Sequence, residues 1–220
     1  MTYPITIVDN FFEDPDKIVE FAESLEYTLN DGRYPGYRSP LLGDVNRRLD
    51  NYLQRKYINL FYHDPDIIGW KFSNSFQKVW PHHEDQYHGM NCGMMHRDGM
   101  WQMGGIVYLT KDPEPDTGTS LYNFKYGYDP KMSDNLFAMH QQLNRREEVD
   151  PDVYQKEYDF YADHFVETVR VDNVYNRLVI FNSQQWHGIK TYGTRKDRPR
   201  LTLPLFGGVA SFGTHPPLLR

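Results

Sequence analysis

Apolar residues in the central part of the chain recur at every second position. Trp70, Phe72, Phe76 and Trp80 all fall on even positions, which is the period of a β-strand with one buried face. Short apolar runs predict further strands at residues 3–8, 106–109, 121–124, 166–171, 178–181 and 201–206. The pattern therefore predicts a mainly β architecture.

Two segments near the beginning of the chain have helical spacing instead. Asp14 and Pro15 supply an N-cap and a first-turn proline for a helix whose apolar positions are Ile18, Phe21, Ala22 and Leu25. A second amphipathic helix, ending near Leu60, is predicted from the spacing of Val45, Leu49, Tyr52 and Leu53.

A polar segment from about residue 133 to residue 164 interrupts the series of strands. Its apolar residues have helical spacing, so it predicts a helical insertion in a strand-to-strand connection: Leu136, Met139, His140 and Leu143. No repeat, low-complexity tract or flexible linker divides the chain. We expect one α+β, mainly β domain over residues 1–220, with the N-terminal helices packed on a jelly-roll-like double sheet.

Composition and charge narrow the functional classes. A net charge of -6 disfavours a general electrostatic grip on nucleic acid. No apolar run is long enough to span a bilayer, and the first residues lack the basic and apolar regions of a signal peptide. Cys92 is the only cysteine, so an intrachain disulfide is impossible. We therefore expect a cytoplasmic protein that does not bind membranes. We also expect that nucleic acid is not its binding partner.

The first candidate for chemistry is His96-Arg97-Asp98. In extended backbone, side chains two residues apart point to the same face, so His96 and Asp98 can bind one ion. A second His-x-Asp triplet, His83-Glu84-Asp85, follows a proline in a charged stretch that is typical of a turn. We favour His96 and Asp98 because a glycine-containing run precedes them and an apolar strand follows them.

The third metal ligand is expected on a distant strand that returns to the same place. The apolar strand at 178–181 runs into a polar turn that ends at His187. Two histidines and one carboxylate with open positions opposite them are typical of non-haem iron(II) oxygenases. Zinc also accepts these ligands. His187 taken alone could equally be an exposed turn residue or a core residue satisfied by hydrogen bonding.

A basic segment follows His187. Arg200 and Thr202 share one face of the last strand, with Leu201, Leu203 and Leu205 on the other. A guanidinium beside a hydroxyl is suited to binding a carboxylate in a pocket. The alternative is a solvated basic turn, which is our interpretation of Arg195 and Arg198.

Taken together, residues 87–206 resemble the 2-oxoglutarate and iron(II)-dependent dioxygenase superfamily, in particular its prolyl-hydroxylase-like branch. The motifs that carry the resemblance are Tyr87-His88-Gly89 before His96-Arg97-Asp98, Val107-Tyr108-Leu109-Thr110, Gly118-Thr119-Ser120-Leu121, the distal His187 and Arg200-Leu201-Thr202. Two departures are a long interval between His187 and Arg200, which makes Arg198 a rival, and a missing second glycine after Gly118.

The resemblance implies a double-stranded β-helix (jelly roll, cupin-like) and an Fe(II) ion bound by His96, Asp98 and His187. It implies that Tyr108, Arg200 and Thr202 hold the distal carboxylate of the cosubstrate 2-oxoglutarate, and that Tyr87 lies near the metal. O2 would be consumed and succinate and CO2 released while a protein side chain or small molecule is hydroxylated. Asp98 favours hydroxylation over halogenation, because related halogenases have a small residue there. Trp101 and Trp186 flank the ligands and either line the substrate pocket or simply pack.

Two other functions remain open at this stage. One is a non-catalytic jelly-roll protein with a structural metal, for which the Arg200 and Thr202 pair would have no use. The other is an AlkB-like nucleic-acid demethylase, which the acidic charge balance disfavours.

Overall fold

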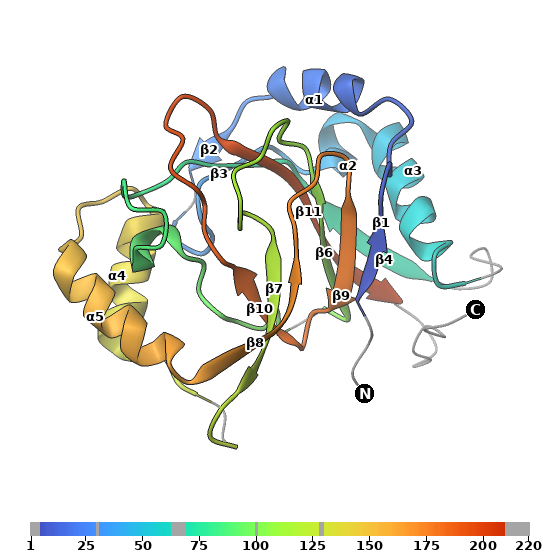
Figure 1. The fold of residues 1–220 in the computed structure, drawn as a ribbon. Coiled ribbons are helices and arrows are strands. Elements are labelled where there is room, and N and C mark those ends of the chain that lie inside the picture. Colours follow the sequence, from blue (N-terminus) through green and yellow to red (C-terminus); the bar gives the residue numbers. More distant parts are fainter. Residues whose placement is uncertain (1–4, 30, 63–68, 100, 128–129, 210–220) are drawn as a thin grey trace.

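The computed structural model describes residues 5–29, 31–62, 69–99, 101–127 and 130–209 (Figure 1). In this part of the chain an eight-stranded antiparallel sheet faces a three-stranded one. The order along the large sheet is β1 (Thr6–Val8), β9 (Leu178–Asn182), β6 (Met103–Tyr108), β11 (Arg200–Val209), β5 (Gln77–Val79), β3 (Tyr37–Arg38) and β2 (Thr28–Leu29), and β4 (Trp70–Asn74) pairs with the far end of β11. The small sheet has the order β10 (Trp186–Ile189), β7 (Thr119–Phe124) and β8 (Phe165–Val171).

Three helices cover one face of the large sheet: α1 (Pro15–Glu23), α2 (Leu42–Val45) and α3 (Arg47–Ile58). The predicted cap of α1 is confirmed, because the Asp14 carboxylate accepts a hydrogen bond from Lys17 N and Pro15 occupies the first turn. The second predicted helix is α3, and the side chain of Asn46 caps it. Leu25, expected at the end of the first helix, lies beyond the last residue of α1.

The last strand divides its side chains between two faces, as the alternation predicts. Leu201, Leu203 and Leu205 are buried in the main hydrophobic core together with Phe11 and Tyr57 from the helical layer. Leu178 and Ile180 of β9 join the same core. The opposite face of these strands points to the space between the two sheets.

The predicted insertion forms α4 (Asp134–Asn144) and α5 (Pro151–Ala162), between the neighbouring strands β7 and β8. Figure 1 shows both helices beside the small sheet, away from α1 and α3. A second apolar cluster fixes them there, and it is made of Met90, Cys92, Met94, Met95, Tyr122, Leu136, Met139, Leu143, Tyr154, Tyr158, Tyr161 and Phe165. The insertion is therefore a packed part of the fold.

Several elements differ from the sequence expectations. The alternation from residue 70 to residue 80 spans two strands, since the chain leaves β4 at Ser75 and Phe76 before β5 begins. Phe76 remains fully buried, and its backbone N–H donates to the Ser39 hydroxyl. Of the strand expected at 3–8, residues 3 and 4 lie outside the described residues. The short strands β2, β3 and β10 are not evident from the sequence pattern. No helix in the described ranges has the length and apolar character that crossing a membrane requires.

We expect Leu203→Ala to lower the free energy of unfolding by about 2–5 kcal/mol, because it leaves a cavity at a fully buried position. Urea unfolding followed by circular dichroism measures the loss. Leu41→Ala is the matched control, since that side chain is 49% exposed and its removal leaves no cavity. Equal losses for the two variants would contradict the assignment of β11 to the core.

Candidate metal centre

Backbone pairing brings together the two segments that carry the candidate ligands. His96 and His187 form an isolated antiparallel bridge, with His96 N donating to His187 O (2.9 Å) and His187 N to His96 O (3.0 Å). Asp98 N donates to Ser183 O at 2.9 Å. Ladder hydrogen bonds therefore fix the register between residues that are about ninety positions apart.

The three side chains converge. His187 Nε2 lies 3.3 Å from Asp98 Oδ2, and His96 Nε2 lies 3.5 Å from Asp98 Oδ1. One ligand atom from each residue can be chosen so that all three lie within 4.8 Å of one another. Ligands about 2.0–2.2 Å from a common metal ion lie roughly 3 Å apart when they are at right angles. In the described part of the chain, no other group of His, Cys, Asp or Glu converges in this way.

Hydrogen bonds orient both imidazoles toward the shared point. His96 Nδ1 lies 2.8 Å from Met94 O, and His187 Nδ1 lies 2.8 Å from Gln185 O. A carbonyl only accepts, so each Nδ1 carries the proton and each Nε2 of a neutral ring presents a lone pair. Both histidines thus have the tautomer that a metal ligand needs.

Asp98 supplies the test of fit. Its Oδ2 atom is buried and has no hydrogen-bond donor among the described residues. With neutral histidines, that oxygen faces the lone pair of His187 Nε2, and two acceptors at such a distance require a cation between them. The donor set therefore fits a divalent metal ion, which would satisfy all three groups together.

Electrostatics favours an ionised carboxylate. Burial by itself raises the pKa of Asp98, but His187 and His96 outweigh it and lower this pKa, because in their protonated form these rings donate hydrogen bonds and positive charge to the carboxylate. Burial and the neighbouring His96 lower the pKa of His187. At His96 the loss of hydration opposes protonation, but the carboxylate of Asp98 outweighs it and raises the pKa. In the metal-free protein, His96 is therefore the first of the two histidines to take up a proton.

Space beside the carboxylate depends on a glycine. A Cβ atom at Gly104 on β6 would lie 2.9 Å from Asp98 Oδ2. The ring of Phe181 packs on His187, with 4.6 Å between the ring centroids. A small residue on one strand and an aromatic ring on the next thus hold the ligands in place.

The triad forms part of the wall of a cavity of about 750 Å³. Strands of both sheets line this cavity, and so do helix α4 and residues 33–38 near the N-terminus. The side chain of His96 is 52% exposed, whereas those of Asp98 and His187 are 13% and 8% exposed. The site is therefore open on the His96 side.

Arg200 lies in the same cavity at the start of β11. Its side chain is buried, its Nε donates to Thr117 O at 2.8 Å, and its guanidinium lies over the ring of Tyr108 at 5.5 Å from the centroid. Burial lowers the pKa of Arg200. No carboxylate of the described residues lies within 4.0 Å of it. A buried cation without a counterion is unfavourable, so an anion in the cavity would stabilise Arg200.

Thr202 and Tyr108 lie beside Arg200 and are Cα partners in the sheet. Both are fully buried, and neither is among the residues that line the cavity. The Thr202 hydroxyl is buried and has no hydrogen-bond partner among the described residues. The Tyr108 hydroxyl donates to Thr119 Oγ1 at 2.7 Å. Arg198, the rival of Arg200, is not part of the cavity wall and donates to Asp112 O at the surface.

Tyr87 is the candidate that the structure places elsewhere. It is 51% exposed, its hydroxyl donates to Asp116 Oδ2 (2.8 Å), and it does not line the cavity. The physical reason is the ion pair of Asp116 with Arg170, which gives the phenol a polar partner at the surface. The expectation that Tyr87 lies near the metal is therefore wrong.

The remaining sequence candidates differ in whether they belong to the metal group or to the cavity wall. His83, of the second His-x-Asp triplet, stacks on His88 and belongs to no metal-binding group in the described residues. Trp101 lines the cavity. Trp186 packs against Phe165, with ring centroids 5.0 Å apart, and lies outside the cavity wall.

Sequence reasoning missed the part of the cavity wall that comes from the N-terminal segment and from helix α4. Tyr34 and Arg38 contribute from the N-terminal segment, and Phe137 and His140 from α4. No motif marks these positions, although the helical spacing did place His140 on α4. Its Nδ1 lies 2.9 Å from the Tyr154 hydroxyl, and burial lowers its pKa to about 4, so it is uncharged at neutral pH.

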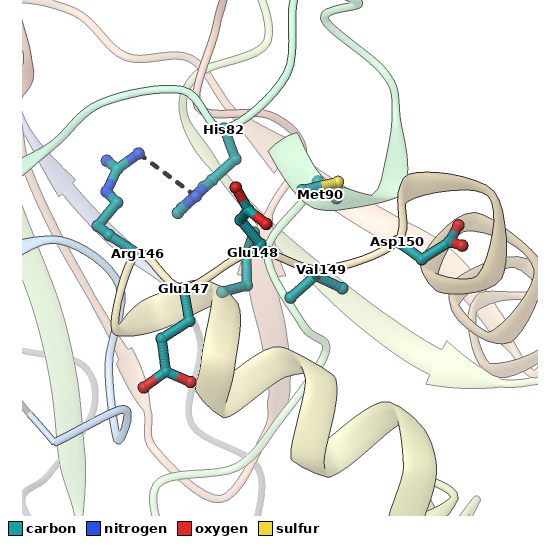
Figure 2. A pocket seen from close by; sticks show the side chains of 8 residues that line it. His82, Met90, Arg146, Glu147, Glu148, Val149 and Asp150 are labelled. Atoms are coloured by element: carbon teal, nitrogen blue, oxygen red, sulfur yellow. Dashed lines mark hydrogen bonds between the residues drawn. The ribbon is translucent and has the colours of Figure 1, made fainter.

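A second pocket of about 500 Å³ lies at the turn between α4 and α5. Figure 2 shows His82 and Arg146 facing each other there, with 3.3 Å between Arg146 Nη1 and His82 Nδ1. Arg146 also donates to the carbonyls of Trp80 and Pro81. These bonds join the turn to the chain after β5. The pairing of Arg146 with His82 is therefore explained by a structural role, and it does not indicate a second functional site.

Comparison with solved structures finds the same overall fold in 2-oxoglutarate and Fe(II) oxygenases. A member of the 2OG-Fe(II) oxygenase family from Burkholderia pseudomallei is 9% identical over 92% of this chain and 83% of its own, with a TM-score of 0.52. A Pseudomonas putida prolyl-4-hydroxylase is 13% identical over 93% and 92%, with a TM-score of 0.51. HygX from Streptomyces hygroscopicus, solved with nickel and 2-oxoglutarate bound, is 13% identical over 94% and 83%, with a TM-score of 0.55.

These likenesses confirm, at the level of fold, the resemblance that the sequence motifs indicate. No curated protein matches the sequence. The model of one protein family, DUF6445, matches residues 1–206, which is nearly the whole chain. The chain therefore belongs to the family of unknown function DUF6445.

Proposed function

We propose that this protein is an Fe(II)- and 2-oxoglutarate-dependent oxygenase that hydroxylates a protein side chain or a small molecule. The proposal includes a double-stranded β-helix formed by the two sheets, and a single domain over residues 1–220. The observation that carries it is the convergence of His96, Asp98 and His187 in a cavity that also contains a buried, uncompensated Arg200.

The arrangement supports a catalytic metal over a structural one. A structural zinc site is closed by four protein ligands, whereas three ligands leave positions free for other molecules. Here the accessible imidazole of His96 borders a large cavity. Coordination positions on that side are open to a cosubstrate and to O2.

The remote end of 2-oxoglutarate would bind to Arg200. The guanidinium is held from behind by Thr117 O and Tyr108, which keeps its position fixed. A carboxylate at this place gains charge-assisted hydrogen bonds, and the Thr202 hydroxyl gains the partner that it lacks. A bound carboxylate would thus account for both the uncompensated charge of Arg200 and the unsatisfied hydroxyl of Thr202.

Bound Fe(II) and 2-oxoglutarate would supply, together with O2, the oxidising chemistry: one oxygen atom of O2 goes into succinate as CO2 is released, and the other goes into a substrate C–H bond. The protein holds both histidines in the metal-binding tautomer through Met94 O and Gln185 O. The ring of Phe181 packs on His187 and helps to keep this imidazole in place.

The Fe(II)-loaded protein, titrated anaerobically with 2-oxoglutarate, is expected to develop a metal-to-ligand charge-transfer band in the visible. His96→Ala and His187→Ala should abolish this band, because each removes one of three ligands. His83→Ala is the matched control, since it alters the other His-x-Asp triplet and should keep the band. Absence of the band in wild-type protein that demonstrably binds iron would favour the non-catalytic metal-binding alternative.

Metal affinity should fall as the pH is lowered from about 8 to about 6, because a proton on His96 must be displaced before the metal binds. The pKa of His96 is raised, so this competition begins nearer neutral pH than for a free histidine. Asp98, whose pKa is lowered, remains ionised throughout this range. Electron paramagnetic resonance of free Mn(II) measures the affinity at each pH. A constant affinity over this range would show that His96 is not a ligand.

Arg200→Gln should weaken 2-oxoglutarate binding to the Mn(II)-loaded protein by at least about tenfold, the effect expected for losing a charge-assisted hydrogen bond. Mn(II) affinity should change by less than about twofold, because Arg200 does not touch the metal ligands. Isothermal titration calorimetry measures both. Arg198→Gln, which removes the neighbouring surface arginine, is the control; a larger effect there than at Arg200 would reverse the assignment.

A further inference from the structure

A second arginine faces the cavity from the opposite side of β5. A row of Cα partners crosses four neighbouring strands of the large sheet. It runs from Arg38 on β3 through Gln77 on β5 and Thr202 on β11 to Tyr108 on β6. Residues in direct register project from the same face of a sheet. Arg38 therefore belongs to the inner face that also presents Arg200, and it lines the same cavity.

The guanidinium of Arg38 lies between aromatic rings. It is 3.8 Å from the centroid of Tyr34 and 5.6 Å from that of Phe206. Its Nε atom is buried and has no hydrogen-bond partner among the described residues. Among those residues, no carboxylate oxygen lies within 4.0 Å of Arg38.

Charges in the loaded site leave Arg38 without a counterion. Fe(II) carries two positive charges, Asp98 one negative charge, 2-oxoglutarate two negative charges and Arg200 one positive charge, so these four neutralise one another. His140 is uncharged, and Arg33 at the rim is paired with Asp31 at 3.1 Å. Burial lowers the pKa of Arg38, and interactions with Tyr34 and Asp98 oppose this shift. In the loaded site the metal ion would already neutralise Asp98, so Arg38 adds one further positive charge to the cavity.

We propose that Arg38 binds a carboxylate group of the primary substrate. The inference rests on the proposed function, and it narrows the substrate class to small organic acids. The rings of Tyr34 and Phe206 contact the guanidinium without using its Nε–H, which has no partner among the described residues and could donate to a carboxylate.

The other residues of the cavity wall indicate the kind of molecule that carries the proposed substrate carboxylate. Trp101, Met132 and Phe137 line the cavity together with Tyr34, so most of the surface near Arg38 and the metal is apolar. Phe137, which lines the cavity, is 53% exposed, so its ring is accessible to a ligand. An aryl or alkyl body between the carboxylate and the carbon to be oxidised would bury these side chains.

The test uses the Fe(II)- and 2-oxoglutarate-loaded protein under anaerobic conditions. The probes are hydrocinnamate, which has a carboxylate on an aryl body, and its uncharged amide hydrocinnamamide. Calorimetry should show that the wild type binds the acid at least about tenfold more tightly than the amide, and that Arg38→Gln removes this preference. Arg38→Lys keeps the positive charge, so this variant should retain part of the preference for the acid. Arg33→Gln is the matched control, because it removes an arginine from the same rim and should keep the preference.

Three results would overturn the inference. The first is that the acid does not bind to the wild type, and the second is that it binds equally to the wild type and to Arg38→Gln when both show the same thermal unfolding. The third is that Arg38→Gln loses 2-oxoglutarate binding while Arg200→Gln keeps it. The last result would make Arg38 the anchor of the cosubstrate.

Failure of this inference is separable from failure of the proposed function. If 2-oxoglutarate binds through Arg200 but the acid binds independently of Arg38, the oxygenase proposal stands and the substrate assignment falls. If 2-oxoglutarate does not bind but the metal-loaded protein still prefers the acid in an Arg38-dependent way, the carboxylate site stands and the oxygenase proposal falls.

Discussion

The arrangement of the site depends on a carboxylate oxygen that faces an imidazole lone pair. Asp98 Oδ2 and His187 Nε2 are both acceptors, they lie 3.3 Å apart, and backbone hydrogen bonds between the two chain segments prevent them from separating. Such a contact is unfavourable unless a proton or a metal ion lies between the two atoms. The fold therefore holds the site in a state that is ready for a cation, and the lowered pKa of Asp98 keeps the carboxylate charged.

The two sheets have complementary roles around this contact. The small sheet contributes His187 through β10, and the large sheet contributes Arg200 and Thr202 through β11. Leu201, Leu203 and Leu205 anchor β11 in the helix-covered core, so burial on one face fixes the polar residues on the other. The separation between the three candidate metal ligands and Arg200 is thus set by the packing of the sheets.

The helical insertion stabilises the segment that carries His96. The Tyr161 hydroxyl on α5 donates to Met95 O at 2.8 Å, and the ring packs in the cluster that includes Met94 and Met95. His96 lies outside the regular strands, so this support from α5 replaces part of the ladder that a strand residue would have. From the same insertion, α4 provides Phe137 and His140 to the cavity wall. The insertion thus supports the segment of His96 and forms part of the cavity wall.

The sequence by itself determined the elements whose signals are local. The alternation in β11, the cap at Asp14 and the helical spacing of residues 133–164 each depend on residues a few positions apart, and the side-chain periods of strand and helix convert them directly into faces. The same period placed His96 and Asp98 on one side, and the resemblance to a known superfamily added His187.

Only the tertiary structure decided which residues share the cavity. Arg38 lies far from the motif region and reaches the site because β3 pairs with β5, a contact between short strands that no local pattern encodes. Tyr87 has the expected motif position, but its distance from the cavity is set by Asp116 and Arg170, which are distant in sequence. The physical reason is the same in both cases: pairing across strands and competition between polar partners depend on which surfaces meet, and the order of residues along the chain does not specify this.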